Sequence, residues 1–204
     1  MYDWMGSSIE QANTIFQEFS LDWKFLFNSG AGEDQITKCE SELNLSLPRS
    51  YREFLLRHNG VHLFYNELEE RSDSSSWWAG SGVKIFGTTD LLSYRHYRQE
   101  TSSPYSEPED QSILIFTYLG RIGTGDSCAL DTAKFSSSEC PVLDCDHDYP
   151  SSIWKETPIA SSFEEWLIKM FDRIINHKSL PEYWYSDTSN DNSLEVAGSS
   201  IGSV

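Results

Sequence analysis

The run Asp144-Cys-Asp146-His-Asp148 places carboxylates at alternate positions, as the first half of a calcium-binding loop does. The second half of such a loop does not follow. Tyr149 stands where the loop needs its turn glycine, and Lys155 stands at the twelfth position, which requires a bidentate glutamate. We therefore interpret the run as the end of a strand followed by a solvated acidic turn.

The cysteines offer a second metal chemistry, because Cys140, Cys145 and His147 could converge on zinc, with the last two on one face of a strand. The chain has no C-x-x-C pair to accompany them, so the sequence predicts no metal and no cofactor. The N-terminus lacks the basic, apolar and small-residue succession of a secretory signal. We therefore expect the four cysteines, which include Cys39 and Cys128, to be reduced in an intracellular, cytoplasmic protein.

Catalytic motifs are incomplete as well. The glycine-rich run 120–126 lacks the Lys-Ser/Thr pair of a phosphate-binding loop and leads into a strand, so we predict a hairpin turn. The Gly-Ser-Gly at 80–82 lacks the spacing of a nucleophile elbow, and His58 follows a helix whose dipole would favour the charged imidazole. The sequence predicts that the chain is not an enzyme. The alternative, a hydrolase or metal-dependent enzyme, would require metal binding or turnover that alanine at His147 or Cys145 abolishes.

Length and charge narrow the classes of partner. The 204 residues include 15 Lys and Arg against 32 Asp and Glu, a formal net charge of -17. Such a surface repels phosphate backbones and anionic lipids, so we expect neither nucleic acid nor a membrane as partner, and the chain has no apolar stretch long enough to span one. A basic protein partner would be attracted. The alternative is that the charge serves solubility alone.

Two acidic segments and the acidic turn are the candidate binding surface. Acidic residues at 67–73 precede Trp77 and Trp78, and aromatic side chains beside carboxylates resemble a recognition surface. The alternative is that both tryptophans begin a strand that continues to Phe86 and enter the core. The candidate partner-binding residues are Glu67, Glu69, Glu70, Asp73, Trp77, Trp78, Glu107, Glu109, Asp110, Asp144, Asp146 and Asp148.

Helix signals lie mainly towards the two ends of the chain. Three amphipathic helices are predicted before residue 60, with Gly60 as the stop of the third, and the strongest apolar stripe runs from Phe163 to Ile174. A short helix is expected from Asp90 to about Arg98. The expected N-terminal caps are Ser7 with Glu10, Asp34, Ser50 with Glu53, Thr88 or Thr89, and Ser161 or Ser162 with Glu164 or Glu165.

The middle of the chain is predicted to form β-strands. Short β-favouring runs occupy 61–65, 83–86, 113–118, 127–130 and 142–145, and an acidic loop is expected over 100–110. We predict a single α+β domain with N-terminal helices, a mostly antiparallel central sheet of about five to six strands and a closing C-terminal helix. The expected organisation is an N-terminal helical extension over 1–33, the main domain over 34–180 and a disordered acidic, Ser-rich tail over 181–204.

The order of these features carries more information than any one of them. The chain contains Ile36-x-x-Cys39-Glu40-x-x-Leu43-x-Leu45-x-Leu47-Pro48-x-x-Tyr51-x-x-Phe54-Leu55-x-x-x-Asn59-Gly60, then Val83-Lys-Ile85-Phe86-Gly87, Gly125-Asp126-x-x-x-x-Leu130-Asp131, Pro141-Val142, Trp154 and Ser161-Ser-Phe163-Glu-Glu-Trp166-Leu167. Over roughly residues 34 to 175 this string resembles the SUKH superfamily, named from the yeast cell-wall assembly regulator and its bacterial relatives. The departures are the N-terminal extension, the insertion at 66–82, the acidic loop before Ile113 and the polar tail.

The resemblance implies function by binding. Many bacterial members look like immunity proteins that neutralise nuclease or deaminase toxins, eukaryotic relatives serve as interaction modules, and members are not generally enzymes. The leading hypothesis is an immunity protein that binds a basic toxin through the carboxylates of 67–73, 107–110 and 144–148. The alternative is a non-toxin interaction or scaffolding module in signalling or assembly. The sequence does not indicate an oligomeric state.

Overall fold

The computed structural model describes residues 1–65, 82–101, 110–120, 127–146 and 148–177. Its six strands form one sheet in the order β1-β2-β3-β4-β5-β6, with every neighbouring pair antiparallel, which confirms the predicted α+β fold. The elements are α1 (Met5–Glu18), β1 (Lys24–Phe27), α2 (Glu33–Leu43), α3 (Arg49–Arg57), β2 (Val61–Tyr65), β3 (Gly82–Ile85), α4 (Thr88–Thr101), β4 (Ile113–Gly120), β5 (Ser127–Asp131), the 3-10 helix η2 (Thr132–Lys134), β6 (Val142–Cys145), α5 (Ser151–Trp154) and α6 (Phe163–Ile175).

The strands match the sequence pattern closely. β2 and β6 have the predicted bounds, and the other three predicted strands differ by one or two residues at an end. β1 was missed, although β3 and β6 are equally short. It forms by pairing with β2, where Leu26 lies opposite His62. β4 and β5 pair with Tyr118 opposite Ser127, so a hairpin joins them, as predicted; its turn, 121–126, lies outside the described residues.

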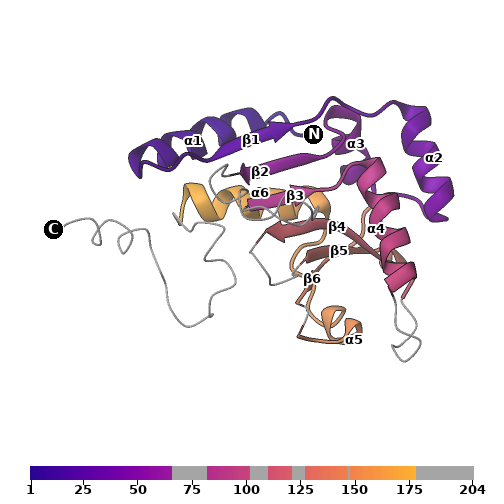
Figure 1. Ribbon diagram of the computed structural model, residues 1–204. Helices are drawn as coiled ribbons and strands as arrows, with labels where there is room; N and C mark the ends of the chain where they lie inside the picture. The colour runs from indigo at the N-terminus through magenta and orange to yellow at the C-terminus, as the bar shows by residue number, and fades with distance from the viewer. Residues whose placement is uncertain (66–81, 102–109, 121–126, 147, 178–204) are drawn as a thin grey trace.

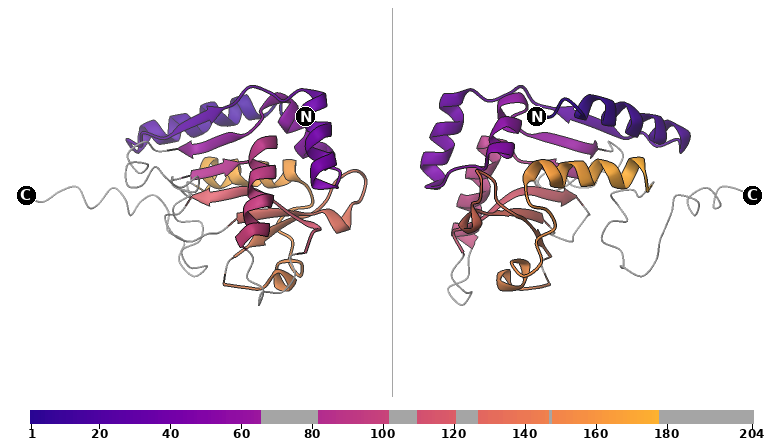
Figure 2. Two further views of the ribbon diagram at one scale, coloured as in Figure 1. Left: turned by 45° about the vertical axis from the view of Figure 1, so that its right-hand side comes forward. Right: turned by 180° about the vertical axis from the view of Figure 1, so that it is seen from behind.

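Helices α4 and α6 lie on opposite faces of the sheet, as the views from the front and from behind show (Figure 1, Figure 2). On the α6 side, the Phe163 ring lies 5.3 Å and the Trp166 ring 5.0 Å from the ring of Phe116 in β4. On the α4 side, the rings of Phe86 and Tyr94 are 5.5 Å apart. The predicted closing helix therefore packs on the sheet through its apolar stripe, as expected.

The first 33 residues contribute to the same core. Tyr2 is 3% exposed, and its hydroxyl donates a 2.6 Å hydrogen bond to the carbonyl of Ser50 in α3. Phe16 of α1 stacks on Phe25 of β1, and α1 contacts α6. The segment expected to be an extension thus supplies one edge strand and part of the aromatic packing.

The α6 cap is as predicted, but the α1 and α2 caps are not. The Ser162 hydroxyl accepts a 3.1 Å hydrogen bond from the amide of Glu165, which confirms that cap. α1 begins at Met5, so Ser7 lies inside the helix and its hydroxyl donates to the carbonyl of Trp4 instead. α2 begins at Glu33, which places Asp34 in the first turn, where its negative charge interacts favourably with the helix dipole.

α3 and α4 receive their N-terminal partners from elsewhere in the chain. Ser50 does not cap α3: its amide and hydroxyl donate to the carboxylate of Glu139 at 2.9 and 2.6 Å. At α4 neither predicted threonine is the cap. The amide of Thr88 donates to the side chain of Asn59 at 2.8 Å, and Asp90 accepts from the amide of Gly87 at 3.0 Å. α4 also runs to Thr101, beyond the predicted end, so residues 100 and 101 are helical rather than part of the predicted acidic loop, and 102–109 lie outside the described residues.

Gly60 is not the stop of α3, which ends at Arg57. Gly60 has a φ of +92°, a conformation that L side chains rarely adopt, and a Cβ there would lie 2.9 Å from the amide nitrogen of Gly87. Its glycine is therefore required to turn the chain into β2 against the segment that leads into α4.

Candidate partner-binding surface

Four of the twelve candidate residues lie in the described part of the chain. Asp110 precedes β4, Asp144 belongs to β6, and Asp146 and Asp148 lie in the turn that leads to α5. The remaining candidates lie outside the described residues: Glu67, Glu69, Glu70, Asp73, Trp77, Trp78, Glu107 and Glu109.

Asp110 is held by the chain itself. One oxygen accepts hydrogen bonds from the amide and hydroxyl of Ser112 at 2.9 and 2.6 Å, and the other accepts from the ammonium group of Lys155 at 2.5 Å. These contacts, the Lys155 bond first, lower the pKa of Asp110 to about 2. The structure therefore joins the start of β4 to the residue that follows α5, 45 positions later.

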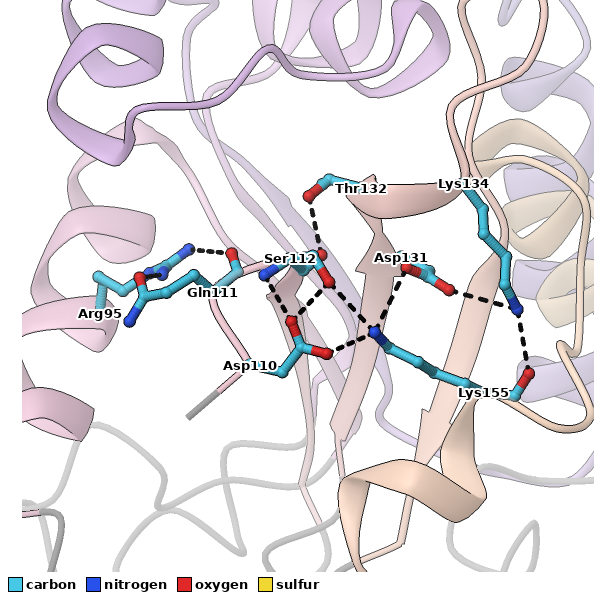
Figure 3. Close-up of polar contacts among 8 residues, drawn as sticks. All are labelled: Arg95, Asp110, Gln111, Ser112, Asp131, Thr132, Lys134 and Lys155. Atoms are coloured by element: carbon cyan, nitrogen blue, oxygen red, sulfur yellow. Dashed lines mark hydrogen bonds and ion pairs between the residues drawn. The ribbon is translucent and has the colours of Figure 1, made fainter. Parts of the chain in front are cut away.

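Asp131 lies beside this contact and is fully buried. Its two oxygens face the ammonium groups of Lys155 at 3.9 Å and Lys134 at 3.5 Å, which are ion-pair distances rather than hydrogen bonds (Figure 3). The ammonium of Lys134 also donates to the backbone carbonyl of Lys155 at 3.2 Å. Two cations around a buried carboxylate offset the desolvation that burial costs.

Figure 3 shows these residues as one connected set, which we call the Asp131 network: Asp110, Ser112, Asp131, Lys134 and Lys155. It ties together the starts of β4 and η2 and the end of α5. Both lysines pair with aspartates of the same network, although the side chain of Lys134 is 51% exposed. Neither lysine therefore offers its full positive charge to an approaching partner.

The acidic turn after β6 has a defined shape. One Asp146 oxygen accepts a 2.9 Å hydrogen bond from the amide of Asp148, and the Asp146 carbonyl accepts one of 2.9 Å from the indole of Trp154. Asp148 is exposed. Asp144 differs, because it lies opposite Cys128 in the sheet and so points to the face where Cys128 is buried beside Trp166 of α6. Asp144 and Asp146 are half-buried, so of the three aspartates Asp148 is the most accessible.

Exposed apolar side chains gather near the same turn. Among the six large hydrophobic side chains exposed in the described residues, Phe135 follows η2, Tyr149 precedes α5 and Ile153 lies in α5. The Lys134–Lys155 bond holds the two segments against each other. We call this surface the α5 corner and define it by Phe135, Asp148, Tyr149, Ile153 and Glu156; α5 itself lies beside β6 at the end of the molecule away from α1 (Figure 1).

The environment of the cysteine thiols does not favour nucleophilic or metal-binding chemistry. All four cysteines are buried and free, and burial raises the pKa of Cys145 and of Cys140 to about 12. Such thiols are poor nucleophiles and poor metal ligands near neutral pH. No group of three or more potential metal ligands occurs within the described ranges, and His147 lies outside them.

His58 corrects an expectation from the helix dipole. Its ring lies 4.8 Å from that of Phe27 and 5.8 Å from that of Phe54, and burial lowers its pKa, with Arg57 adding to the effect and a backbone hydrogen bond at Asn28 opposing it. Desolvation by the aromatic rings outweighs the dipole at the end of α3, so the neutral imidazole is favoured.

No helix in the described part of the chain has both the length and the apolar character needed to cross a bilayer.

Sequence reasoning named Asp110 as a candidate but missed its partners in the Asp131 network. Asp131 appeared only as the last member of a motif, and Lys155 only as a residue that spoils a calcium loop. Lys155 lies 24 positions from Asp131 and 45 from Asp110, beyond the reach of any local pattern, whereas Lys134 lies only three positions from Asp131. The available signal was an aspartate directly after the apolar residues Cys128, Ala129 and Leu130, since a buried carboxylate there needs a cation.

Comparison with known proteins identifies the family. The model of the SMI1 / KNR4 family (SUKH-1) matches residues 30–169. The chain belongs to this family. "Immunity protein RhsIB" of Dickeya dadantii (strain 3937) is 21% identical over 170 residues, which cover 83% of this chain and 92% of that protein. "Uncharacterized protein YnaB" of Bacillus subtilis (strain 168) is 24% identical over 165 residues, 80% of this chain and 88% of that protein.

The family match begins before α2 and ends inside α6. It confirms the resemblance to the SUKH superfamily that the ordered motifs indicated. It includes β2 to β6, the Asp131 network and the α5 corner, whereas α1 and β1 precede it. The candidate binding surface of this chain therefore lies within the SUKH-1 part of the fold.

Proposed function

We propose that this chain is an immunity-type protein that neutralises a cognate toxin by stoichiometric binding. The observation that carries the proposal is the likeness to a relative named as an immunity protein, which spans most of both chains. Binding needs a presented surface rather than a reaction centre, and the α5 corner offers one with exposed apolar and acidic side chains.

The toxin of this proposal is a basic protein, such as a nuclease or a deaminase. A protein that acts on nucleic acid carries positive charge for the phosphate backbone, and the net charge of -17 on this chain is its electrostatic complement. Opposite net charges accelerate encounter and make association sensitive to salt. Neutralisation then follows from occupation of the basic surface and requires no catalysis by this chain, which would act in the cytoplasm where the toxin arrives.

The test begins with the tagged full-length chain and a lysate of its own cells. Proteins retained at low salt are eluted with rising salt and identified by mass spectrometry. Each candidate is then expressed in a host that lacks both proteins, with and without this chain. We expect one basic protein, recovered in equal amount, that stops growth alone and permits growth when this chain is present. Salt should weaken the purified pair.

Two results would overturn the proposal. A partner that is harmless when expressed alone would favour an interaction module in signalling or assembly. A toxic partner whose effect persists despite equal expression of this chain would remove neutralisation as the function. An affinity that stays flat from low to high salt would contradict the electrostatic part alone.

A further inference from the structure

We propose that the α5 corner is the docking surface for the basic partner, with Tyr149, Ile153 and Phe135 as its apolar anchors. This inference deepens the proposed function and rests on it only for the identity of the partner as a toxin. It differs from the sequence prediction in its aromatic residues, which were Trp77 and Trp78 and lie outside the described residues.

The apolar content of the corner is the first argument. Phe135 is 42%, Tyr149 56% and Ile153 41% exposed, and Tyr149 is the most exposed large hydrophobic residue in the described part of the chain. Leaving these groups in water forfeits the free energy that burial would give. Aromatic and aliphatic anchors that become fully desolvated supply most of the energy in protein interfaces.

The charge of the corner is the second argument. The cations beside it, Lys134 and Lys155, pair with Asp131 and Asp110. The side chain of Lys134 is 51% exposed, and Asp148 and Glu156 are exposed as well, so exposed carboxylates outnumber exposed cations on the corner. An apolar centre with an acidic rim fits a protein that presents an apolar pocket bordered by Lys or Arg.

The same charge argues against other occupants. A second copy of this chain would bring another net charge of -17 to an acidic surface, which opposes association. A phosphate backbone is repelled for the same reason. The remaining occupant is a basic protein.

The corner is also held in position before binding. The Asp131 network fixes the residue after α5, and the indole of Trp154 fixes the turn through its bond to the carbonyl of Asp146. A surface that is already ordered loses less conformational entropy when a partner binds. The network thus acts as the support of the anchors and not as a contact of its own.

The test uses the full-length chain with the photoreactive residue benzoylphenylalanine at position 149 or 153. Matched controls carry it at Ile168 or Leu26, which are 45% and 46% exposed but lie in α6 and β1. After irradiation in its own cells, we expect adducts with one basic protein from positions 149 and 153 and none from the controls. With that protein purified, Tyr149→Ala and Ile153→Ala should each weaken binding at least about tenfold, and Ile168→Ala less than about twofold.

Any of four results would overturn the docking surface. These are adducts between two copies, adducts from the control positions alone, no adducts, or an affinity that Tyr149→Ala and Ile153→Ala leave unchanged. The outcome for toxin neutralisation is separate. A basic partner that crosslinks only at the corner but is harmless when expressed alone supports the surface and removes the immunity function. If this chain neutralises a toxin but the toxin crosslinks only at the control positions, the immunity function is supported and the docking surface is overturned.

Discussion

Around β1 and β2 the sheet is packed with aromatic rings, whereas near the starts of β4 and η2 a buried carboxylate and two lysines connect neighbouring segments through ion pairs. In the first region the rings of Phe25, Phe64 and Phe171 lie 5.3 to 5.9 Å from one another. In the second, Asp131 is fully buried and its partners are the ammonium groups of Lys134 and Lys155.

The two regions have different roles: the aromatic rings stabilise the fold, and the Asp131 network positions the exposed α5 corner. Ring packing is non-directional and contributes in proportion to the area buried, so it stabilises the fold without fixing any one surface group. Ion pairs and hydrogen bonds are directional, and they end at α5, where the exposed anchors lie. We infer that the aromatic region determines whether the chain folds and that the Asp131 network determines how the α5 corner is presented.

The largest expected effect is in the aromatic region. Phe171 is buried, and its ring lies 5.9 Å from that of Phe25 and 5.7 Å from that of Phe64. Phe171→Ala should lower the free energy of unfolding by about 3–5 kcal/mol, measured as a lower urea midpoint at unchanged slope. Ile168→Ala, in the same helix but exposed, is the control and should cost less than about 1 kcal/mol. Equal losses would contradict the role of the ring cluster.

The next effect is in the Asp131 network. Lys155→Met leaves Asp131 buried with one cation and should cost about 2 kcal/mol of unfolding free energy, less than for a wholly unpaired charge because Lys134 remains. Adding Asp131→Asn should cost less than the sum of the two single changes, because the buried charge is gone. Lys169→Met, which removes an exposed pair with Glu165, is the control and should cost less than about 1 kcal/mol. Additive urea midpoints would show that the network is not coupled.

A smaller effect is expected where α3 meets the loop before β6. Glu139→Gln removes a carboxylate that accepts two hydrogen bonds from Ser50 and should cost about 1 kcal/mol in urea unfolding. Glu53→Gln is the matched control, because Glu53 pairs with Arg49 on the helix surface and should cost about 0.3–0.5 kcal/mol. If both changes cost the same, Glu139 is not a cap of α3.

The smallest effect is a difference in pH response. Burial lowers the pKa of His58, so its stabilising contribution is complete above the unfolded pKa of about 6.5 and is lost as the pH falls below it. The pKa of Asp110 is about 2, so its contribution is present above its unfolded value and is lost only as the pH falls through about 2.

Urea midpoints between about pH 7.5 and about pH 5.5 separate these two groups. The His58→Gln variant should lose less stability over this interval than the unaltered chain. The Asp110→Asn variant, the matched control, should keep the slope of the unaltered chain because Asp110 does not titrate there. A slope that Asp110→Asn changes and His58→Gln does not would reverse the assignment.

Local patterns predicted a large part of the fold. The apolar stripe of α6 and its Ser162 cap, and the positions of β2 to β6, follow from spacings of two to four residues, which local sequence encodes directly. The ordered string of motifs also indicated the SUKH family, which the family match confirms. β1 and the four-residue helix α5 were missed, because such short elements depend on their neighbours for stability.

The sequence by itself determined the α+β class, the family, the excess of acidic residues and the apolar faces of the main helices. Only the tertiary structure decided that Glu139 caps α3 from 89 residues away, that Lys155 reaches Asp110 and Asp131, and that the ammonium of Lys134 bonds the carbonyl of Lys155 beside α5. The physical reason is range. Helix and strand periodicity arises between near neighbours in the chain, whereas ion pairs, caps and surfaces form between any groups that the topology of the sheet brings together.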